Sequence, residues 1–534
     1  PMAHSPLTSA LRRAHAAYLS SEQTGIPVDE IVEMRAQPVL PRGAFLAGAG
    51  AALAGAAAWP LGAAASRTPR VAIIGAGLAG LTCAYRLRQA GIAATVFEAN
   101  SGVGGRTWTL RDYFDDGQIA ENGGEFISSE HTAIRNLAQE MGLELVDLRA
   151  AQKAGTQELY YVRGERYTFH AMLRDYATVY PKIKAAAEAG YPAVYNRYTP
   201  AGRALDLVSA REWIEQHIPG GTSSRIGWLL DIDATTENGG ESSAQSSLEL
   251  IGMLGYMPNY NPKGGFYLVG TDERYGVRGG NDQIAARLNA HLPEGTVRTN
   301  AALIGLRKRS DGTYLCSFES QMQTFDVKAD HVVLALPFST LRRVDLTKAG
   351  FDARKMKAIN ELQLGTNTKI YMQFHGRPWL DRGFNGFTYA DTGFQQTLDS
   401  SRGQTGKSGI LEFYSGGKVG ASYGPASFAP ASADAARKQL AGLEPLYPGI
   451  TKAWNGKAFM DYWTGDRWHK GSYTYWSVGQ CTTIAGYERK RQGNVHFAGE
   501  HTAVNFQGFM NGAVATGEAA AGEILGHSAA ASGI

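Results

Sequence analysis

A glycine-rich turn near the front of the chain has the residue types that hold a dinucleotide. Gly75, Gly77 and Gly80 come between an apolar run, Val71 to Ile74, and a helical pattern from Leu81 to Ala90. Gly75 allows a tight turn, Gly77 lets the backbone approach a pyrophosphate, and Gly80 permits close packing of helix on strand. The free N–H groups and positive dipole of the helix N-terminus favour phosphate. The turn therefore predicts a dinucleotide site.

Two charged side chains follow this turn. Glu98 stands at the end of a second apolar run, Ala94 to Phe97, where its carboxylate can accept hydrogen bonds from ribose hydroxyls. Arg106 ends the cluster that starts at Gly102, and it can meet phosphate oxygens or the edge of a flavin. A lone glycine fingerprint is a weak signal, but the complete strand–turn–helix–strand–acid unit of about thirty residues has the expected size.

These side chains require an α/β domain to position them. Further strand-like runs are Leu303 to Lys308, Tyr314 to Glu319, Thr324 to Val327, Val332 to Leu336, Thr368 to Phe374 and Gly409 to Tyr414. The first three predict a β-meander with a turn at Asp311-Gly312. Tyr167 to Gln216 is mostly helical in pattern, and Ser400 to Gly409 is typical of a surface loop.

Composition limits the class of protein. At 534 residues the chain is too long for one core, so two or three domains are expected. A net charge of +3 gives no electrostatic case for nucleic acid. The three cysteines, Cys83, Cys316 and Cys481, are scattered and predict neither a disulfide framework nor a metal site.

A second glycine-rich segment lies far along the chain. Phe497-Ala498-Gly499-Glu500 is followed by a run from Gly508 to Gly517, and Asn122-Gly123-Gly124-Glu125 lies nearer the front. With the first turn, Glu98 and Arg106, these motifs resemble the flavin-containing amine oxidase family, which includes monoamine, polyamine and L-amino acid oxidases. The resemblance spans Val71 to about Ile524 and implies FAD. It also implies a two-domain fold, with a discontinuous Rossmann-type FAD domain and an α+β substrate domain.

The resemblance assigns roles around the cofactor. Glu500 would meet the ribityl or pyrophosphate part, a helix near Gly508 would aim at the isoalloxazine ring, and Val297 would lie against the adenine. Ser472 stands where monoamine oxidases carry a flavin-linked cysteine, so the FAD should be non-covalent. The implied cofactor-binding residues are Gly75, Gly77, Ala79, Gly80, Glu98, Gly105, Arg106, Gly124, Glu125, Val297, Glu500, Gly508, Phe509 and Met510.

Three catalytic residues follow from the same resemblance. Lys369 lies in a strand-like stretch otherwise poor in charge, ten residues before Trp379. The family lysine holds a water near flavin N5 that serves re-oxidation. Tyr473 and Phe509 would flank the amine, since aromatic faces guide a cation and exclude water. A solvent-facing lysine and core aromatics are the structural alternatives.

The far end of the substrate is harder to assign. Venom-type L-amino acid oxidases hold the carboxylate with an arginine near the position of Phe126, so that clamp is missing here. Candidate substrate residues are Phe126, Tyr389, Trp476, Asp231 and Asp233, with Trp108, Arg278 and Glu237 also considered. The acidic residues could receive a basic side chain, and a solvated acidic loop is the alternative. A bacterial subgroup that includes arginine-preferring oxidases resembles the Gly-Gly-Glu-Phe-Ile form and the long leader.

The sequence therefore predicts an FAD-dependent L-amino acid oxidase, with basic amino acids such as arginine or lysine among its substrates. Its products would be a 2-oxo acid, ammonia and hydrogen peroxide. A monoamine or polyamine oxidase, a non-catalytic FAD-fold binding protein and a nicotinamide dehydrogenase remain alternatives. Its partners would be a small-molecule amine or amino acid and O2. The sequence leaves open whether the protein forms a homodimer.

Domain boundaries and location complete the predictions. The FAD domain comprises 70–130, 272–340 and 481–526, the substrate domain 131–271 and 341–480, and residues 1–69 form a leader. Leu7 to Arg35 predicts two short amphipathic helices. Ala44 to Ala65 is signal-like but too rich in alanine for a membrane span. The preceding Pro41-Arg42-Gly43 resembles a twin-arginine signal lacking one arginine, which indicates a periplasmic or secreted protein, or a cytoplasmic one if the leader is inactive.

Overall fold

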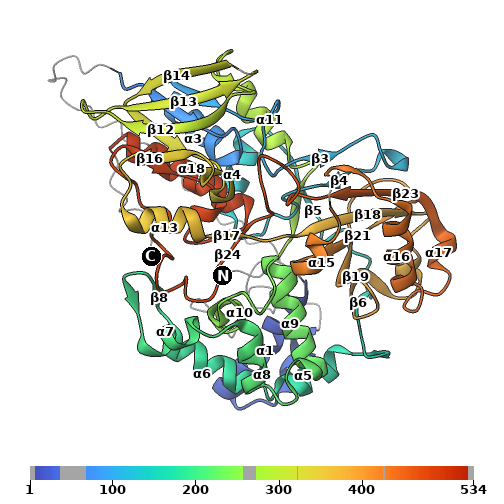
Figure 1. Cartoon of the computed structure of the whole chain (residues 1–534). Helices are drawn as coiled ribbons and strands as arrows, with labels where there is room; N and C mark the ends of the chain where they lie inside the picture. The colour runs from blue at the N-terminus through green and yellow to red at the C-terminus, as the bar shows by residue number, and fades with distance from the viewer. Residues whose placement is uncertain (1–5, 37–67, 257–271, 322, 425–426, 527–534) are drawn as a thin grey trace, which may run out of the picture.

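The structure is a computed structural model that describes residues 6–36, 68–256, 272–321, 323–424 and 427–526. The predicted signal-like segment, Ala44 to Ala65, lies outside these ranges. Three regions are visible in Figure 1: a cofactor region at upper left, a strand-rich region at right and a helical region at the bottom. Among the described helices, none is both long and apolar enough to cross a membrane.

Five parallel strands form the central sheet of the cofactor region, in the order β11-β2-β1-β15-β25. They are β1 (Val71–Ile74), β2 (Ala94–Phe97), β11 (Val297–Arg298), β15 (His331–Leu334) and β25 (Val495–Phe497). β1 lies in the middle and pairs with β2 and β15. The strands come from three stretches of chain separated by long insertions, which confirms the predicted discontinuous α/β fold.

Helices cover one face of this sheet. They are α3 (Leu78–Gln89), α4 (Thr132–Glu140), α11 (Gln283–Ala290) and α18 (Met510–Ile524). Because side chains alternate along a strand, Val71 and Ile73 of β1 pack under these helices, whereas Ala72 and Ile74 face the opposite side. The two glycine-rich segments thus meet through α3 and α18, which lie in contact.

A second, four-stranded sheet covers the other face in the order β14-β13-β12-β16. Its strands are β12 (Ala302–Lys308), β13 (Tyr314–Ser320), β14 (Gln323–Ala329) and β16 (Asp345–Lys348). The predicted β-meander corresponds to β12, β13 and β14, which pair antiparallel in sequence. Two further helices, α12 (Phe338–Leu341) and α13 (Ala353–Glu361), follow in the chain.

An eight-stranded sheet, in the order β22-β23-β18-β21-β20-β19-β6-β7, forms the strand-rich region. Its strands are β6 (Gln157–Val162), β7 (Glu165–Arg166), β18 (Thr368–Phe374), β19 (Phe384–Ala390), β20 (Gln396–Asp399), β21 (Gly409–Ser415), β22 (Ala429–Pro430) and β23 (Trp454–Asp461). The helices after these strands are α14 (Pro378–Asp381), α15 (Gly417–Ala421), α16 (Ala433–Leu443) and α17 (Ile450–Ala453). Every residue of β18 is buried, including Lys369. A lysine in such a strand requires nearby charge or hydrogen-bond acceptors.

The helical region contains the helices predicted between Tyr167 and Gln216, two later helices that were not predicted, and two helices from the N-terminal extension. They are α1 (Pro6–Thr24), α2 (Val28–Ala36), α5 (Phe169–Tyr176), α6 (Tyr180–Gly190), α7 (Pro200–Asp206), α8 (Ala210–His217), α9 (Arg225–Asn238) and α10 (Ser247–Gly255). Figure 1 shows α1 among α5, α8, α9 and α10. Ser209 and Glu212 form a capping box on α8, and Ser224 caps α9.

Short strand pairs connect the regions. They are β3 (Thr109–Leu110) with β4 (Ala120–Glu121), β5 (Leu145–Asp147) with β10 (Tyr275–Val277), β8 (Ala193–Val194) with β9 (Arg197–Tyr198), and β17 (Gln363–Leu364) with β24 (Thr474–Tyr475). The last pair matters most for the site. It places Tyr473, just before β24, beside the chain that leads into β18.

Candidate active site

A continuous cavity of about 410 Å³ joins the cofactor region to the faces of β18 and β21. The predicted site residues that line it are Gly75, Gly77, Ala79, Glu98, Gly105, Arg106, Gly124, Glu125, Phe126, Lys369, Tyr473, Glu500, Gly508, Phe509 and Met510. They come from segments more than four hundred residues apart. One cavity is therefore lined by most of the predicted cofactor-binding residues and by all three predicted catalytic residues.

The turn after β1 leaves no room for a side chain. Gly75 has a φ of +107°, and a Cβ there would lie 2.6 Å from the carbonyl oxygen of Ala335. A Cβ on Gly80 would lie 2.0 Å from the carbonyl oxygen of Gly75. α3 starts after Gly77 with no side chain capping its first N–H groups. These free donors and the close backbone fit a bound pyrophosphate.

Glu98 lies at the carboxyl end of β2, beyond the turn. Its carboxylate accepts the backbone N–H groups of Ala76 and Asn100, each at 2.7 Å. Burial raises the pKa of Glu98, and these hydrogen bonds oppose the shift. The side chain is thereby fixed in the cavity wall, as the predicted ribose contact requires.

A salt bridge joins the two glycine-rich segments directly. Arg106 Nη1 donates to Glu500 Oε1 at 2.8 Å and to the carbonyl oxygen of Ser472 at 2.5 Å. The other Glu500 oxygen accepts the Gly508 N–H at 2.9 Å. Both side chains line the cavity. The predicted residues Arg106 and Glu500 therefore act as one unit, which fits a group placed between the turn and α18.

One buried amide also fits a bound ring system. Asn122 lines the cavity, and neither atom of its side-chain amide has a hydrogen-bond partner within the described chain. The backbone carbonyl oxygen of Asn122 accepts the indole N–H of Trp463 at 2.5 Å, which fixes the segment. A buried amide without partners is costly, so a polar ligand edge beside it would be stabilised.

Val297 does not reach the cavity. It lies in β11 at the edge of the central sheet, opposite Val96, and packs against the apolar core beneath α3. Ala302, Leu303 and Ile304 of β12 line the cavity beyond Glu98 instead. The predicted adenine contact is corrected accordingly: the next strand, not β11, supplies the apolar wall.

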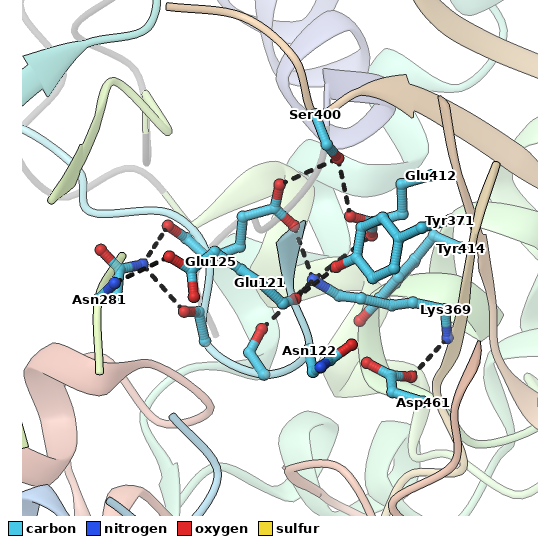
Figure 2. Close-up of polar contacts among 12 residues, drawn as sticks. Glu121, Asn122, Glu125, Asn281, Lys369, Tyr371, Ser400, Glu412, Tyr414 and Asp461 are labelled. Carbon is cyan, nitrogen blue, oxygen red and sulfur yellow. Dashed lines mark hydrogen bonds and ion pairs between the residues drawn. The ribbon is translucent and has the colours of Figure 1, made fainter. Parts of the chain in front are cut away.

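Lys369 lies at the centre of a buried charge cluster (Figure 2). Its Nζ donates to Glu125 Oε2 at 2.6 Å and to the carbonyl oxygens of Glu121 at 3.0 Å and Gly123 at 3.3 Å. Glu412 Oε1 is 3.5 Å away. Burial acts to lower the pKa of Lys369, but Glu125, Glu412 and Asp461 together outweigh it and raise the pKa above its usual range. The residue is therefore a fixed ammonium rather than a strand-edge lysine in solvent.

The carboxyl groups around Lys369 differ in the direction in which their pKa values are shifted. Burial raises the pKa of Glu412 well above its usual range, and Glu125 adds to the shift. Burial also acts on Glu125, but Lys369 and the hydrogen bond with Glu412 bring its pKa below the usual value. Asp461, whose Oδ1 accepts the Lys369 backbone N–H at 2.7 Å, has its pKa raised by burial to about 8. The directions of these shifts favour charge on Lys369 and Glu125 and the neutral form of Glu412 and Asp461.

Two tyrosines face each other in the cavity. The hydroxyl of the predicted Tyr473 lies 2.6 Å from that of Tyr414, which the sequence analysis did not single out. Tyr414 and Glu412 are two residues apart on β21, and Tyr414 is opposite Lys369 across the ladder. Strand alternation along Gly409 to Tyr414 was the available signal for both residues. Phe509 lines the same cavity.

Tyr389 and Trp476 lie elsewhere. Tyr389 lies on β19 and is buried against the helical region, where its hydroxyl accepts the Leu7 N–H at 2.8 Å and its ring stacks on Tyr160. Trp476 packs in the apolar core between the cofactor sheet and the meander. Neither lines the cavity, so their predicted substrate roles are not supported by their positions. Both rings belong to cores whose other half comes from distant segments.

The acidic residues predicted at the substrate, Asp231, Asp233 and Glu237, all lie on α9 but point to different surroundings. Asp231 pairs with Arg211 at 2.7 Å, and Asp233 accepts the Thr8 hydroxyl at 2.6 Å. Neither aspartate lines the cavity, but Glu237 at the end of the same helix does. The prediction of a solvated acidic loop is also wrong, because this stretch is helix and Asp233 and Glu237 are buried.

Two further charged groups were missed. Glu273 lines the cavity with a φ of +45°, an uncommon value for a residue with a side chain, and burial raises its pKa well above the usual range. Arg402 lies in the segment predicted as a surface loop but is 8% exposed. Its guanidinium packs 5.5 Å from the ring centre of Phe126, and its Nε donates to the Asp399 carbonyl oxygen at 2.9 Å. It is thus a buried cation behind the cavity wall.

Comparisons with known proteins agree with this arrangement. A family model described as "Flavin containing amine oxidoreductase" matches residues 78–525. Putrescine oxidase of Kocuria rosea is 25% identical over 480 residues (85% of this chain and 95% of that protein), and "Putative L-amino-acid oxidase YobN" of Bacillus subtilis (strain 168) is 25% identical over 489 residues (86% and 95%). "Amine oxidase [flavin-containing] A" of Sus scrofa is 23% identical over 472 residues (85% and 84%).

Solved structures show the same fold. Putrescine oxidase bound to putrescine superposes with a TM-score of 0.71 at 22% identity, covering 86% of this chain and 99% of that one. Cyclohexylamine oxidase from Brevibacterium oxydans IH-35A superposes with a TM-score of 0.72 at 20% identity, with the same coverage. The arrangement of the three regions therefore follows a known fold.

Proposed function

We propose that this chain, which belongs to the flavin containing amine oxidoreductase family, oxidises L-amino acids that carry a basic side chain, such as arginine or lysine. When bound, FAD would supply the two-electron oxidation of the substrate at the carbon next to the amine, with O2 as the final electron acceptor and hydrogen peroxide as its product. The imine formed from the substrate is hydrolysed to a 2-oxo acid and ammonia. Family membership carries the cofactor and the reaction type; the substrate class is the proposal.

The observation that carries the substrate class is the acidic wall of the cavity. Glu237 and Glu273 both line it and both act electrostatically on Tyr473. Glu125, Glu412 and Asp461 lie on the β18 side, where Lys369 balances one of them. A cation that binds beside buried carboxyl groups stabilises their charged form. This wall favours a substrate with a positive group besides the reacting amine.

The amino acid part of the proposal has a separate support. Arg402 is buried behind Phe126, and Phe126 occupies the cavity wall near the place of the missing carboxylate clamp. A guanidinium in a low-dielectric wall attracts a carboxylate over several ångströms. We therefore expect the substrate carboxylate on the Phe126 side and the basic side chain towards Glu237.

The chain's own residues bind the cofactor, orient the amine and exclude water from it. The turn at Gly75, together with Glu98 and the Arg106–Glu500 pair, fits the cofactor. Tyr473 and Phe509 bound the space in which the amine must lie, and their rings exclude water. Lys369 stays protonated and places an ammonium in the wall, where it can orient a water or stabilise negative charge that develops during oxygen reduction.

A diamine or monoamine oxidase is the second candidate. Kocuria rosea putrescine oxidase is among the relatives, and the same acidic wall would suit the second ammonium of a diamine. A diamine needs no carboxylate partner, so Arg402 separates the two hypotheses. A third candidate, an FAD-fold protein without catalysis, predicts that no amine reduces the flavin.

Anaerobic mixing with a substrate panel tests the proposal. Purified holoenzyme is mixed with L-arginine, L-lysine, L-leucine, putrescine and tyramine, and the loss of flavin absorbance is followed. The two basic amino acids should bleach the flavin fastest. Faster bleaching by putrescine would favour the diamine oxidase, and an unbleached flavin with every compound would favour the non-catalytic protein. Glu237→Gln should slow arginine more than leucine.

A further inference from the structure

The first helix of the chain is a core element of the helical region. Leu7, Ala10, Leu11, Ala14 and Ala17 of α1 are fully buried. They pack in one apolar cluster with residues of α5, α6, α8, α9 and α10. α1 therefore differs from a detached leader, although it precedes the predicted signal-like segment in the chain.

The N-terminal end of α1 also makes buried polar contacts. The Thr8 hydroxyl donates to Asp233 Oδ1 on α9 at 2.6 Å, and the Arg12 guanidinium donates to the carbonyl oxygen of Met253 on α10 at 2.7 Å. Asp233 is fully buried. Because a buried carboxyl is costly without hydrogen bonds, the Thr8 contact fixes α9 relative to α1.

The same face of α9 reaches the cavity one turn later. Glu237 is four residues beyond Asp233, so the two side chains lie one above the other on the helix, and Glu237 lines the cavity. The carbonyl oxygen of Thr236 accepts the Asn367 amide at 2.7 Å and the Tyr473 hydroxyl at 3.4 Å. A shift of α9 would therefore move Glu237 and the support of Tyr473 together.

We propose that α1 is a positioning element of the substrate site, which acts through Asp233 on the last turn of α9. The inference holds whichever amine the enzyme oxidises, because it concerns the wall and not the substrate. It also has a consequence for the predicted leader. Cutting the chain within residues 37–67 would leave α1 attached by its packing and its hydrogen bonds alone.

Thr8→Val tests the route from α1 to the cavity, since valine keeps the shape and removes the hydroxyl. In hydrogen-exchange measurements on the holoenzyme, the amides of residues 234–238 should exchange about tenfold faster, because the last turn of α9 opens more easily. KM should rise about fivefold with a smaller change in kcat. The exchange readout needs no substrate, so it separates this inference from the proposed function.

Arg13→Ala is the matched control on the same helix. Arg13 pairs with Glu158 of β6 at 3.1 Å, away from α9. It should leave the exchange of residues 234–238 at the wild-type rate. Wild-type exchange and KM in Thr8→Val would overturn the inference, and so would equal effects of both variants, because these would mean a general loosening.

Cleavage of the intact holoenzyme gives a second test. A specific protease site is inserted between residues 37 and 67, and the cut protein is analysed by size exclusion and intact mass. The fragment carrying α1 should stay bound with the rate of flavin reduction preserved. Departure of the fragment without loss of that rate would overturn the inference.

Discussion

At the cofactor end of the cavity the backbone supplies most of the polar groups, whereas at the substrate end charged side chains supply them. The first end is built from glycine turns, free N–H groups and the Arg106–Glu500 pair. The second end is built from carboxyls around Lys369 and Tyr473 on strands and helices that meet only in the folded chain. Side chains added at the cofactor end should therefore weaken cofactor binding, whereas changes of charge at the substrate end should impair catalysis and substrate choice.

The largest effect should come from volume at the cofactor end. Gly80→Ala places a Cβ 2.0 Å from the Gly75 carbonyl oxygen and should distort the turn. We expect FAD affinity to fall at least ~100-fold, corresponding to about 2.7 kcal/mol. Flavin fluorescence on titration of the apoprotein measures it. Gly102→Ala in the following loop, where a Cβ meets nothing within 4 Å, is the control and should bind normally. Equal affinities would contradict the role of the tight turn.

Removing the ammonium at the substrate end should have the next largest effect on function, together with a larger effect on stability. Lys369→Met should slow re-oxidation of the reduced flavin by about 100-fold, the range of a positioned polar group. It should also destabilise the fold by about 3–5 kcal/mol, because Glu125 loses its buried partner. Stopped-flow mixing of the reduced enzyme with oxygen measures the first effect.

A double variant separates the two effects. Lys369→Met with Glu125→Gln should recover much of the stability and none of the re-oxidation rate. An unchanged oxidative half-reaction in Lys369→Met would remove the proposed role of this lysine.

A single charge in the acidic wall should have a smaller effect on substrate choice. Glu237→Gln should raise KM for L-arginine about tenfold, or about 1.4 kcal/mol, with little change for L-leucine. Asp231→Asn, on the same helix but paired with Arg211 away from the cavity, is the control. A similar change in KM for both amino acids would indicate that Glu237 contributes to the shape of the cavity and not to recognition of the substrate's positive charge.

The smallest effect concerns pH. Burial raises the pKa of Asp461 to about 8, against about 3.9 in an unfolded chain. Between these values the folded state binds more protons, so this group's contribution to stability is lost as the pH rises towards 8. Asp461→Asn should therefore flatten the decline of Tm between about pH 5 and about pH 8, by a few degrees. The exposed Asp434→Asn is the control, and equal slopes in the two variants would refute the assignment.

The comparison also explains what the sequence could predict. Gly75 to Glu98 is one local β-α-β unit, so its residue types and spacing already imply the site. The adenine contact predicted for Val297 was wrong because the sequence pattern does not tell whether β11 or β12 reaches the cavity. The substrate roles predicted for Tyr389 and Asp233 were wrong because these side chains bind Leu7 and Thr8, which lie more than two hundred residues away in the sequence.

The residues at the substrate end were harder to predict because strand register brings them together. Lys369 was visible as a charged residue in an apolar strand, but its opposition to Tyr414 and Asp461 is set by pairing with β21 and β23. Glu412 and Tyr414 were within reach of simple alternation along β21. Arg402 was not, because most of this glycine- and serine-rich loop does lie at the surface and, before β21 begins, only Ser401 and Arg402 are buried.

The products of L-arginine oxidation test the central claim most directly. Holoenzyme is incubated with L-arginine in air, and hydrogen peroxide, ammonia and the 2-oxo acid are quantified, the last with catalase present to protect it. The account predicts that all three form in equal amounts, and that putrescine gives less peroxide at the same concentration. Peroxide and an aminoaldehyde from putrescine, with no 2-oxo acid from any L-amino acid, would contradict it.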